Sequence, residues 1–179
     1  ISPEEGVSAI TVAAQAIARM RLGRVDSKTT ANIGRIEGGT VTNIVAERCQ
    51  VTAECRSLDQ TLLSEQSEHM KDCVRTAAES AGARVSIRES MEYHAYQVPM
   101  DGLAMRQFRA ACQALDLTPQ LITLGGGSDM NVLARGGLEG MVLSCGMQQM
   151  HSCQEYITID DLVMTTALVE KLMTIEVPD

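Results

Sequence analysis

Two stretches of residues that alternate between apolar and polar, Thr29–Ile36 and Thr42–Ser57, lie on either side of Gly38-Gly39. Paired glycines between two such stretches are a strong local signal for a β-hairpin. The sequence therefore predicts two antiparallel strands, and the rest of the first half of the chain must be arranged around them.

The second of these stretches has two chemically different faces. Successive side chains of a strand point to opposite sides of the sheet. Apolar residues occupy one face and polar residues the other, namely Val51, Ala53 and Cys55 against Thr52, Glu54 and Arg56. Arg56 is therefore expected to point away from the core, toward solvent or a cleft.

Helical patterns flank the predicted hairpin. One helix is expected from about Pro3 to Leu22, with Ser2 as its N-cap and Glu5 completing a capping box. Because the chain opens on a helix cap, we expect it to have been cut from a longer polypeptide. A second helix is expected from a capping-box pattern at Ser57–Gln60 to about Ala81, with Gly82 at its C-terminal left-handed position.

Residues Ala83–Ser90 alternate again and predict a further strand. The order is then helix, strand, strand, helix, strand. One more strand before Ile1 would complete the split βαβ, ferredoxin-like arrangement. The fold class predicted for residues 1–91 is therefore α/β, with its first strand missing.

Residues 92–179 alternate between helical and strand patterns, which is typical of an α/β layer. We expect a helix over Asp101–Leu115, strands at Pro119–Leu124 and Met141–Cys145, and a last helix capped by Thr158. The last helix is expected to carry its apolar side on Leu162, Thr166, Val169 and Met173. Three strands at most are too few for a complete sheet, so this part is expected to be an incomplete α/β segment.

Composition excludes several classes of protein. A net charge of -8 and an aromatic content of 2% argue against a nucleic-acid partner. The negative charge also argues against an anionic membrane as the main partner, and no membrane span is expected because the chain has no run of about 18 apolar residues. Its six cysteines show no CxxC spacing, which is typical of reduced cysteines in a cytoplasmic protein.

The first candidate site is the run Gly125–Asn131. A strand that ends in three glycines before a helix lets backbone N–H groups approach a carboxylate or phosphate, with Gly126, Gly127, Ser128 and Asp129 around it. The alternative is a tight turn in which Asp129 stabilises the helix dipole.

The second candidate is His151, which follows the predicted strand Met141–Cys145 and could bind a metal. Glu155 could orient the imidazole or the loop. The alternative is a partly exposed loop histidine, because a zinc site needs at least three protein ligands.

The third candidate pairs the amide of Asn43 with the guanidinium of Arg56, which together could clamp a peptide carbonyl or a terminal carboxylate. The alternative is a turn asparagine and a surface arginine. His69 and His94 are expected to be structural or solvated.

Four motifs give the chain a family resemblance: GRIEGGTVTNIV at 34–45, AECRSLD at 53–59, GGGSDMN at 125–131 and GMQQMHSCQEYITIDDL at 146–162. In combination and in this order they resemble the peptidase T-like branch of the dinuclear zinc peptidases. The resemblance implies that residues 1–91 are a lid domain able to form a homodimer and residues 92–179 the closing part of a catalytic domain.

The resemblance also assigns roles to residues. It implies that His151 is the last metal ligand, that Asn43 and Arg56 bind substrate, and that Gly126, Gly127, Ser128 and Asp129 line the substrate site. Such enzymes hold two Zn²⁺ ions, which polarise a peptide carbonyl and activate a water molecule.

The family's other metal ligands and its general base would lie upstream of Ile1, in a missing N-terminal catalytic half. The leading interpretation is therefore part of a two-metal exopeptidase that hydrolyses short peptides, inactive by itself and without a catalytic base of its own. The alternatives are a non-catalytic lid or dimerisation module, a fragment of a related amidohydrolase, and an α/β domain binding a small anion at Gly125–Ser128.

Overall fold

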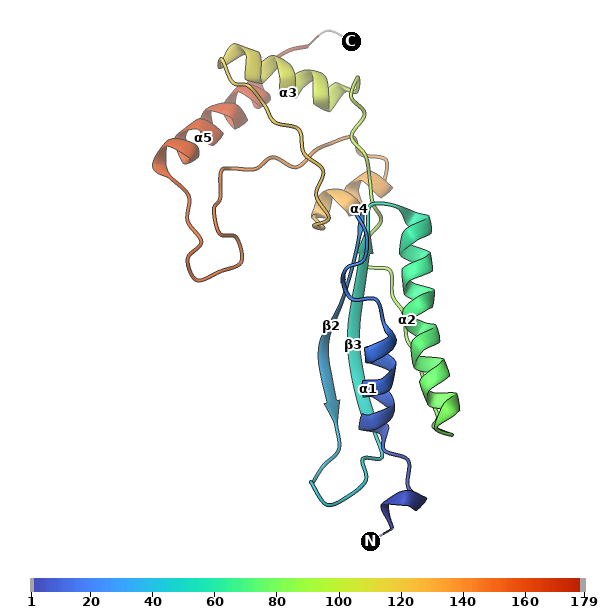
Figure 1. The fold of residues 1–179 in the computed structure, drawn as a ribbon. Coiled ribbons are helices and arrows are strands. Elements are labelled where there is room, and N and C mark those ends of the chain that lie inside the picture. The colour runs from blue at the N-terminus through green and yellow to red at the C-terminus, as the bar shows by residue number, and fades with distance from the viewer. Residues whose placement is uncertain (1, 178–179) are drawn as a thin grey trace. The chain divides into compact units, whose positions relative to one another are not determined.

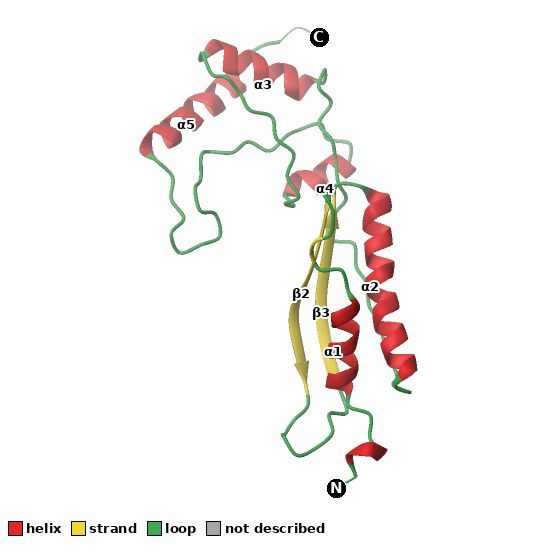
Figure 2. Ribbon diagram, viewed as in Figure 1, coloured by secondary structure: helices red, strands yellow, loops and turns green. Residues whose placement is uncertain are grey.

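The computed structural model describes residues 2–177 and divides into two compact units, Ile1–Met91 and Glu92–Asp179 (Figure 1). The first unit contains one sheet and two long helices. The second contains three helices joined by long irregular segments (Figure 2).

The sheet of the first unit confirms the predicted hairpin. β2 (Thr29–Gly38) and β3 (Cys49–Ser57) are antiparallel, and the two-residue β1 (Gly23–Arg24) pairs with the outer edge of β2. Cross-strand pairs such as Ala31 with Cys55 and Thr30 with Arg56 place apolar and polar residues on opposite faces. The predicted orientation of Arg56, away from the core, is confirmed, because its side chain is exposed.

Two helices cover the apolar face of the hairpin. α1 (Ala9–Arg19) and α2 (Gln60–Ser80) pack against each other and against both long strands (Figure 1). Their contact is built from small or flexible apolar side chains, which are buried: Ala16, Ala31, Met70, Cys73, Ala77 and Ala78. This two-layer α/β unit needs no aromatic residue in its core.

α2 begins after Asp59, which is its N-cap and lies two residues beyond Ser57, the first residue of the predicted capping box. The Asp59 carboxylate accepts hydrogen bonds from the backbone N–H groups of Thr61 (3.0 Å) and Leu62 (3.3 Å). Ser57 Oγ accepts from the Asp59 N–H instead of capping the helix itself. At the other end Gly82 has the predicted left-handed backbone, with φ of +66°.

The first helix is shorter than predicted. Pro3–Glu5 forms a single 3₁₀ turn, Gly6 is extended, and α1 starts only at Ala9, where Ser8 Oγ accepts from the Thr11 N–H. The Ser2–Glu5 capping box does not form. The Ala9 N–H donates to the Ala46 carbonyl (2.8 Å), so a contact with the hairpin loop determines where the helix begins.

The hairpin loop is longer than the glycine pair suggested. β3 starts at Cys49 rather than Thr42, and residues 39–48 form a loop closed by the buried Ala46. Gly39 has φ of +71°. Alternation alone could not show this, because the start of a strand depends on where its partner ends.

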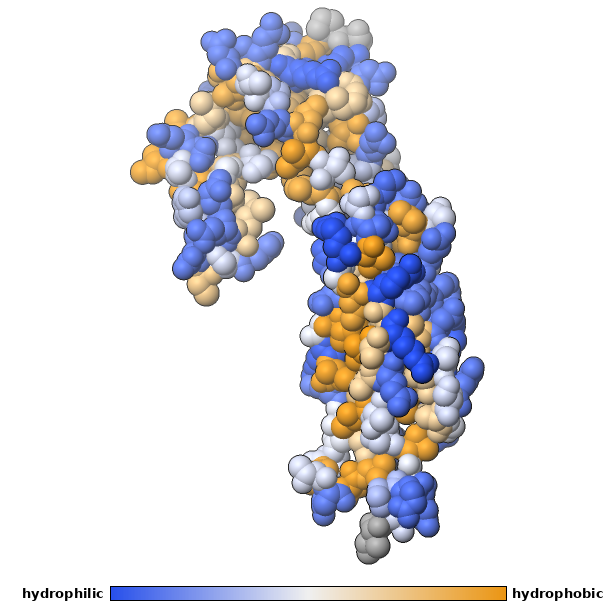
Figure 3. All heavy atoms as spheres, in the orientation of Figure 1, coloured by the Kyte–Doolittle hydropathy of each residue, from blue (hydrophilic) through white to orange (hydrophobic). Residues whose placement is uncertain are grey.

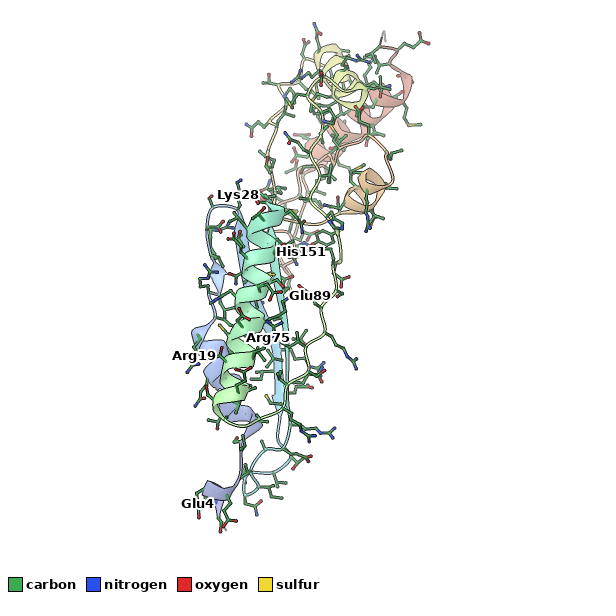
Figure 4. The ribbon with its side chains drawn as sticks, turned by 90° about the vertical axis from the view of Figure 1, so that its right-hand side faces the viewer. Glu4, Arg19, Lys28, Arg75, Glu89 and His151 are labelled. Carbon is green, nitrogen blue, oxygen red and sulfur yellow. The ribbon has the colours of Figure 1, made fainter. Side chains whose placement is uncertain are left out.

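The strand predicted at Ala83–Ser90 does not form, and this segment carries no regular secondary structure. It is held beside α2 by a side chain instead of a backbone ladder. Glu89 bonds Ser67 and pairs with Lys71 Nζ at 2.8 Å (Figure 4). Val85 and Ile87 are both exposed, so burial does not follow the alternating sequence, and no strand among the described residues pairs with this segment.

In the second unit α3 (Leu103–Ala114) packs against α5 (Ile159–Thr174), with the short α4 (Asp129–Arg135) between them in the chain. Met105, Phe108 and Cys112 of α3 form the core. Partly buried residues pack against this core from the rest of the unit, namely Val98, Leu117, Met141, Leu143, Leu168 and Leu172.

The strands predicted at Pro119–Leu124 and Met141–Cys145 are also absent. Both segments are extended chain without regular structure. The second still alternates in burial, because Met141 and Leu143 pack on the core while Val142 is exposed. An incomplete α/β segment was predicted, and among residues 92–177 it contains three helices and one isolated bridge, between Gln148 and Tyr156.

The apolar face predicted for the last helix is not the face that α3 covers. Leu162, Val169 and Met173 are 53%, 44% and 82% exposed, whereas Leu168 and Leu172 pack on the core. Helix α5 is therefore apolar on two sides, and only one of them is covered. Hydrophobic patches are visible on this unit in Figure 3.

Within residues 2–177, none of the helices has the length and hydrophobicity needed to cross a membrane. All six cysteines, which lie within the described residues, are free.

The cap on α2 leads to a pH-dependent prediction. The Leu62 N–H and the Lys28 ammonium hold the pKa of Asp59 below its ordinary value of 3.8. The ionised Asp59 carboxylate therefore stabilises the folded state above pH 3.8. This stabilisation is lost as the pH falls through the pKa that Asp59 has in the folded state. Asp59→Ala should lower the Tm by a few degrees, roughly as other N-cap losses do.

Asp59→Asn is the matched control, because asparagine keeps the capping oxygen but carries no charge. Its free energy of unfolding should lie below that of the wild type at pH 7, and the difference should shrink as the pH falls below 3.8. Thermal unfolding followed by circular dichroism between these values measures both effects, and identical pH profiles for the two proteins would contradict the assignment.

The glycines of β2 allow a test of helix packing. A β-carbon at Gly38 would lie 2.8 Å from Ile10 Cγ1 of α1 and 3.0 Å from the Arg48 carbonyl oxygen. Gly38→Ala should therefore destabilise the unit by about 1–3 kcal/mol. Gly34→Ala is the control in the same strand, because its nearest neighbour would be the Thr52 carbonyl oxygen at 3.9 Å. Urea unfolding that ranks the two variants equally would show that α1 does not press on the strand.

Candidate functional site

The glycine loop, Gly125–Ser128, is anchored at its C-terminal end by Asn131. The Ser128 N–H donates to Asn131 Oδ1 (2.9 Å), and Asn131 Nδ2 donates to the His94 carbonyl (2.8 Å). Asn131 is only 8% exposed. One buried amide therefore ties the loop to the connector that precedes α3.

The connector also contacts the loop directly. The phenol of Tyr93 occupies the space where a β-carbon of Gly127 would lie, with its hydroxyl oxygen 2.5 Å from that point. Gly125 and Gly126 face open space instead. Only the third glycine is thus required by close packing, and the first two leave their backbone accessible.

The predicted residues of this site lie together because they are consecutive. Gly126 and Gly127 are exposed, Ser128 is half-buried, and Asp129 is the exposed first residue of α4. The acidic side chain at this position favours the start of the helix. Tyr93 and Asn131 were not predicted as site residues, although Asn131 has the capping-box spacing from Ser128 that could have identified it.

His151 lies at the tip of a short closed loop. Residues Gln148 and Tyr156 exchange two backbone hydrogen bonds (2.8 and 3.2 Å) that close the loop. His151 is exposed and has a left-handed backbone, with φ of +63°. Such a conformation is costly for a residue with a side chain.

Glu155 stabilises the backbone of this loop. Its Oε2 accepts the His151 N–H at 2.7 Å, a charge-assisted hydrogen bond. Of the two roles expected for Glu155, the structure shows the contact with the loop backbone. The imidazole is presented outward from the loop.

A metal site cannot be assembled from the residues that the structure describes. No group of three or more His, Cys, Asp or Glu side chains that could bind an ion occurs among residues 2–177. One imidazole does not hold a zinc ion. The donors present in this chain therefore do not fit a dinuclear centre by themselves.

The structure does not support the predicted clamp between Asn43 and Arg56. Asn43 lies in the hairpin loop, beyond Gly38 and Cys49, whereas Arg56 pairs with Thr30 at the opposite end of β3. At ~3.3 Å per residue, the seven steps from Arg56 to Cys49 already span about 23 Å. The two side chains cannot hold the same carbonyl or carboxylate within one subunit.

Arg56 already binds a carboxylate. Its Nη2 and Nε lie 2.7 and 2.9 Å from Glu54 Oε2, on the polar face of β3. Both side chains are about half exposed, so the pair contributes little to stability. A ligand carboxylate would have to compete with Glu54 for these donors.

His69 is structural, as expected. Its Nε2 accepts the Arg21 N–H (3.2 Å), and Gln66 of the same helix donates to the Arg21 carbonyl (2.8 Å). Two side chains of α2 therefore satisfy both backbone groups of Arg21, in the segment between α1 and β1.

Two hollows on the surface contain none of the predicted site residues. One lies between the start of α1 and Ala81, and the other lies beside the end of α3, from Arg109 to Pro119. Of the candidate residues, Ser128 is half-buried and the others are exposed.

The close approach at the glycine loop gives a matched pair of variants. Gly127→Ala should displace the Tyr93 ring and lower the Tm, whereas Gly126→Ala should leave the Tm unchanged because its new methyl group meets open space. The chain has three tyrosines and no tryptophan, so tyrosine fluorescence reports the displacement directly. Equal Tm and emission for the two variants would exclude the predicted contact.

Both units are similar in sequence to known proteins. Residues 2–82 match the peptidase dimerisation domain of the M20 family. Over 169 residues the chain is 38% identical to the uncharacterized protein YqjE of Bacillus subtilis (strain 168), covering 94% of this chain and 46% of that protein.

Two solved structures extend the likeness to the fold. Aminopeptidase PepT of Bacillus cereus ATCC 10987 is 40% identical, with a TM-score of 0.83. A tripeptidase of Staphylococcus aureus subsp. aureus Mu50 is 34% identical, with a TM-score of 0.88. Each comparison covers 96% of this chain and 46% of the other chain, so the chain spans about half the length of these relatives.

The fold class is confirmed by these comparisons, although three of the predicted strands are not formed. In sequence and in fold the chain resembles peptidase T-like enzymes over about half of their length, and its residues 2–82 match the M20 peptidase dimerisation domain.

Proposed function

We propose that this chain is the part of an M20-type exopeptidase that carries its dimerisation domain and the end of its catalytic domain, and that the complete enzyme hydrolyses short peptides. One observation carries the proposal: both units together resemble an aminopeptidase and a tripeptidase, at 40% and 34% identity, over 96% of the chain. A likeness confined to residues 2–82 would support only a dimerisation module.

The proposal divides the metal site between polypeptide segments. This chain contributes His151 as one ligand of a pair of divalent ions, which we take to be Zn²⁺. The other ligands and the general base lie outside these 179 residues. When bound, the ions would polarise the scissile carbonyl and lower the pKa of a water molecule. The exposed imidazole on a tightly closed loop is suited to completing such a site.

The exposed apolar surface of the second unit supports this division. The outer side of α5 and the unpaired segments 119–124 and 141–145 expose large hydrophobic residues, including Ile122, Val142, Ile159, Val163 and Met173. Patches of this kind indicate a surface that another polypeptide covers. In this proposal the rest of the catalytic domain covers them, with strands beside the two extended segments.

Substrate contacts follow from the accessible groups. The backbone of Gly126 and Gly127, with Ser128 and Asp129 beside it, would hold one end of the peptide. Arg56 offers a bidentate guanidinium to a carboxylate, exchanging Glu54 for substrate. Because Asn43 lies at the other end of the hairpin, it would contact a different group from the one that Arg56 binds.

A homodimer through the first unit belongs to the same proposal. Residues 2–82 match a dimerisation domain, and β1 pairs with only Thr30 and Ala31 of the β2 edge. The remaining length of that edge has backbone groups available for a second copy. The free cysteines favour a cytoplasmic location. The second candidate function is the dimerisation module without catalysis.

His151 provides the decisive test. In the complete peptidase, His151→Ala should remove about one of two bound ions per subunit and most of the tripeptide hydrolysis, because an ion loses a ligand. His94→Ala is the matched control, since the structure uses only the backbone carbonyl of His94. Metal content by mass spectrometry and peptide hydrolysis by chromatography measure the two effects.

Full occupancy by two ions in the His151→Ala variant would exclude His151 as a ligand. Chelator-sensitive tripeptide hydrolysis by the 179-residue chain alone would contradict the division of ligands. A stable dimer without peptidase activity in the complete protein would favour the second candidate.

A further inference from the structure

We propose that Tyr93 is a further substrate-contacting residue, whose hydroxyl completes the binding surface at the glycine loop and helps to select the peptide. This inference rests on the proposed function, which assigns the loop to substrate. It adds a side chain from a different part of the sequence, 34 positions before Gly127.

The position of the hydroxyl is the first argument. Gly127 has no β-carbon, and the tip of the Tyr93 ring fills that space, with Oη 2.5 Å from where the β-carbon would lie. The edge of the ring at Cζ, together with the hydroxyl bonded to it, is therefore held against the loop. Tyr93 is half-buried, so its phenol remains partly accessible from solvent.

The second argument is that the arrangement is rigid on both sides. Asn131 bonds the Ser128 N–H and the His94 carbonyl, the neighbours in sequence of Gly127 and Tyr93. Because this amide is buried, its two hydrogen bonds are costly to break. The phenol and the loop are thus held together before any ligand binds.

The third argument is chemical. A phenol hydroxyl can donate a hydrogen bond to a carbonyl or carboxylate oxygen, the groups that a short peptide presents. The ring adds an apolar surface beside the exposed backbone of Gly125 and Gly126. Together these features recognise a peptide main chain next to an apolar side chain. The competing interpretation is that Tyr93 only packs against Gly127.

The variant Tyr93→Phe separates the two interpretations, because it keeps the ring and removes only the hydroxyl. In the complete peptidase it should raise KM for a tripeptide roughly three- to tenfold, as expected for one lost hydrogen bond, with kcat nearly unchanged. Tyr96→Phe, in the same connector, is the matched control and should change neither constant.

The Tm of each variant is measured beside the kinetics. An unchanged KM for Tyr93→Phe would overturn the inference, and a lowered Tm with unchanged KM would assign Tyr93 a packing role alone. Failure of the proposed function is distinguishable, because the wild-type complete protein would then hydrolyse no peptide at all, which would overturn this inference as well.

Discussion

A β-strand is stable only where a neighbouring strand satisfies its backbone groups, and this constraint explains most of the structure. β2 and β3 form because each supplies the other's hydrogen bonds. The segments 83–90, 119–124 and 141–145 have strand-like sequences and no strand beside them, so they stay irregular. Side-chain burial still alternates at Met141, Val142 and Leu143. Met141–Leu143 therefore shows the alternating burial of a strand without a strand partner among the described residues.

Local signals in the sequence were therefore more reliable than boundaries set by distant contacts. The hairpin, the two faces of β3 and the left-handed Gly82 depend on neighbouring residues and were predicted, whereas the residue that caps α2 is Asp59 and not Ser57. The start of α1 was not, because the Ala9 N–H bonds a carbonyl 37 positions later. The covered face of α5 was also mispredicted, because helical periodicity cannot show which of two apolar sides meets α3.

In the candidate sites too, arrangements of neighbouring residues were easier to predict than contacts between distant ones. Gly126 to Asp129 lie together because they are consecutive, and His151 is at the tip of its loop because Gln148 and Tyr156 close it. Pairing Asn43 with Arg56 required a three-dimensional contact, and the length of the hairpin excludes it. The contact of Tyr93 with Gly127 could not be predicted, because the two residues are far apart in the sequence and no sequence pattern connects them.

The two units differ in how much of their apolar surface is covered. In the first unit apolar residues gather between the hairpin and its helices, and the polar face of the sheet carries Arg56 and Glu54. The second unit has an uncovered apolar side on α5, and His151 belongs to no group of three or more potential metal-binding side chains among the described residues. The uncovered apolar surface and the metal-binding role proposed for His151 would both be accounted for by the same further segment. A single further polypeptide segment, long enough to bring strands and acidic or histidine ligands together, would satisfy both requirements, and the relatives are about twice as long as this chain.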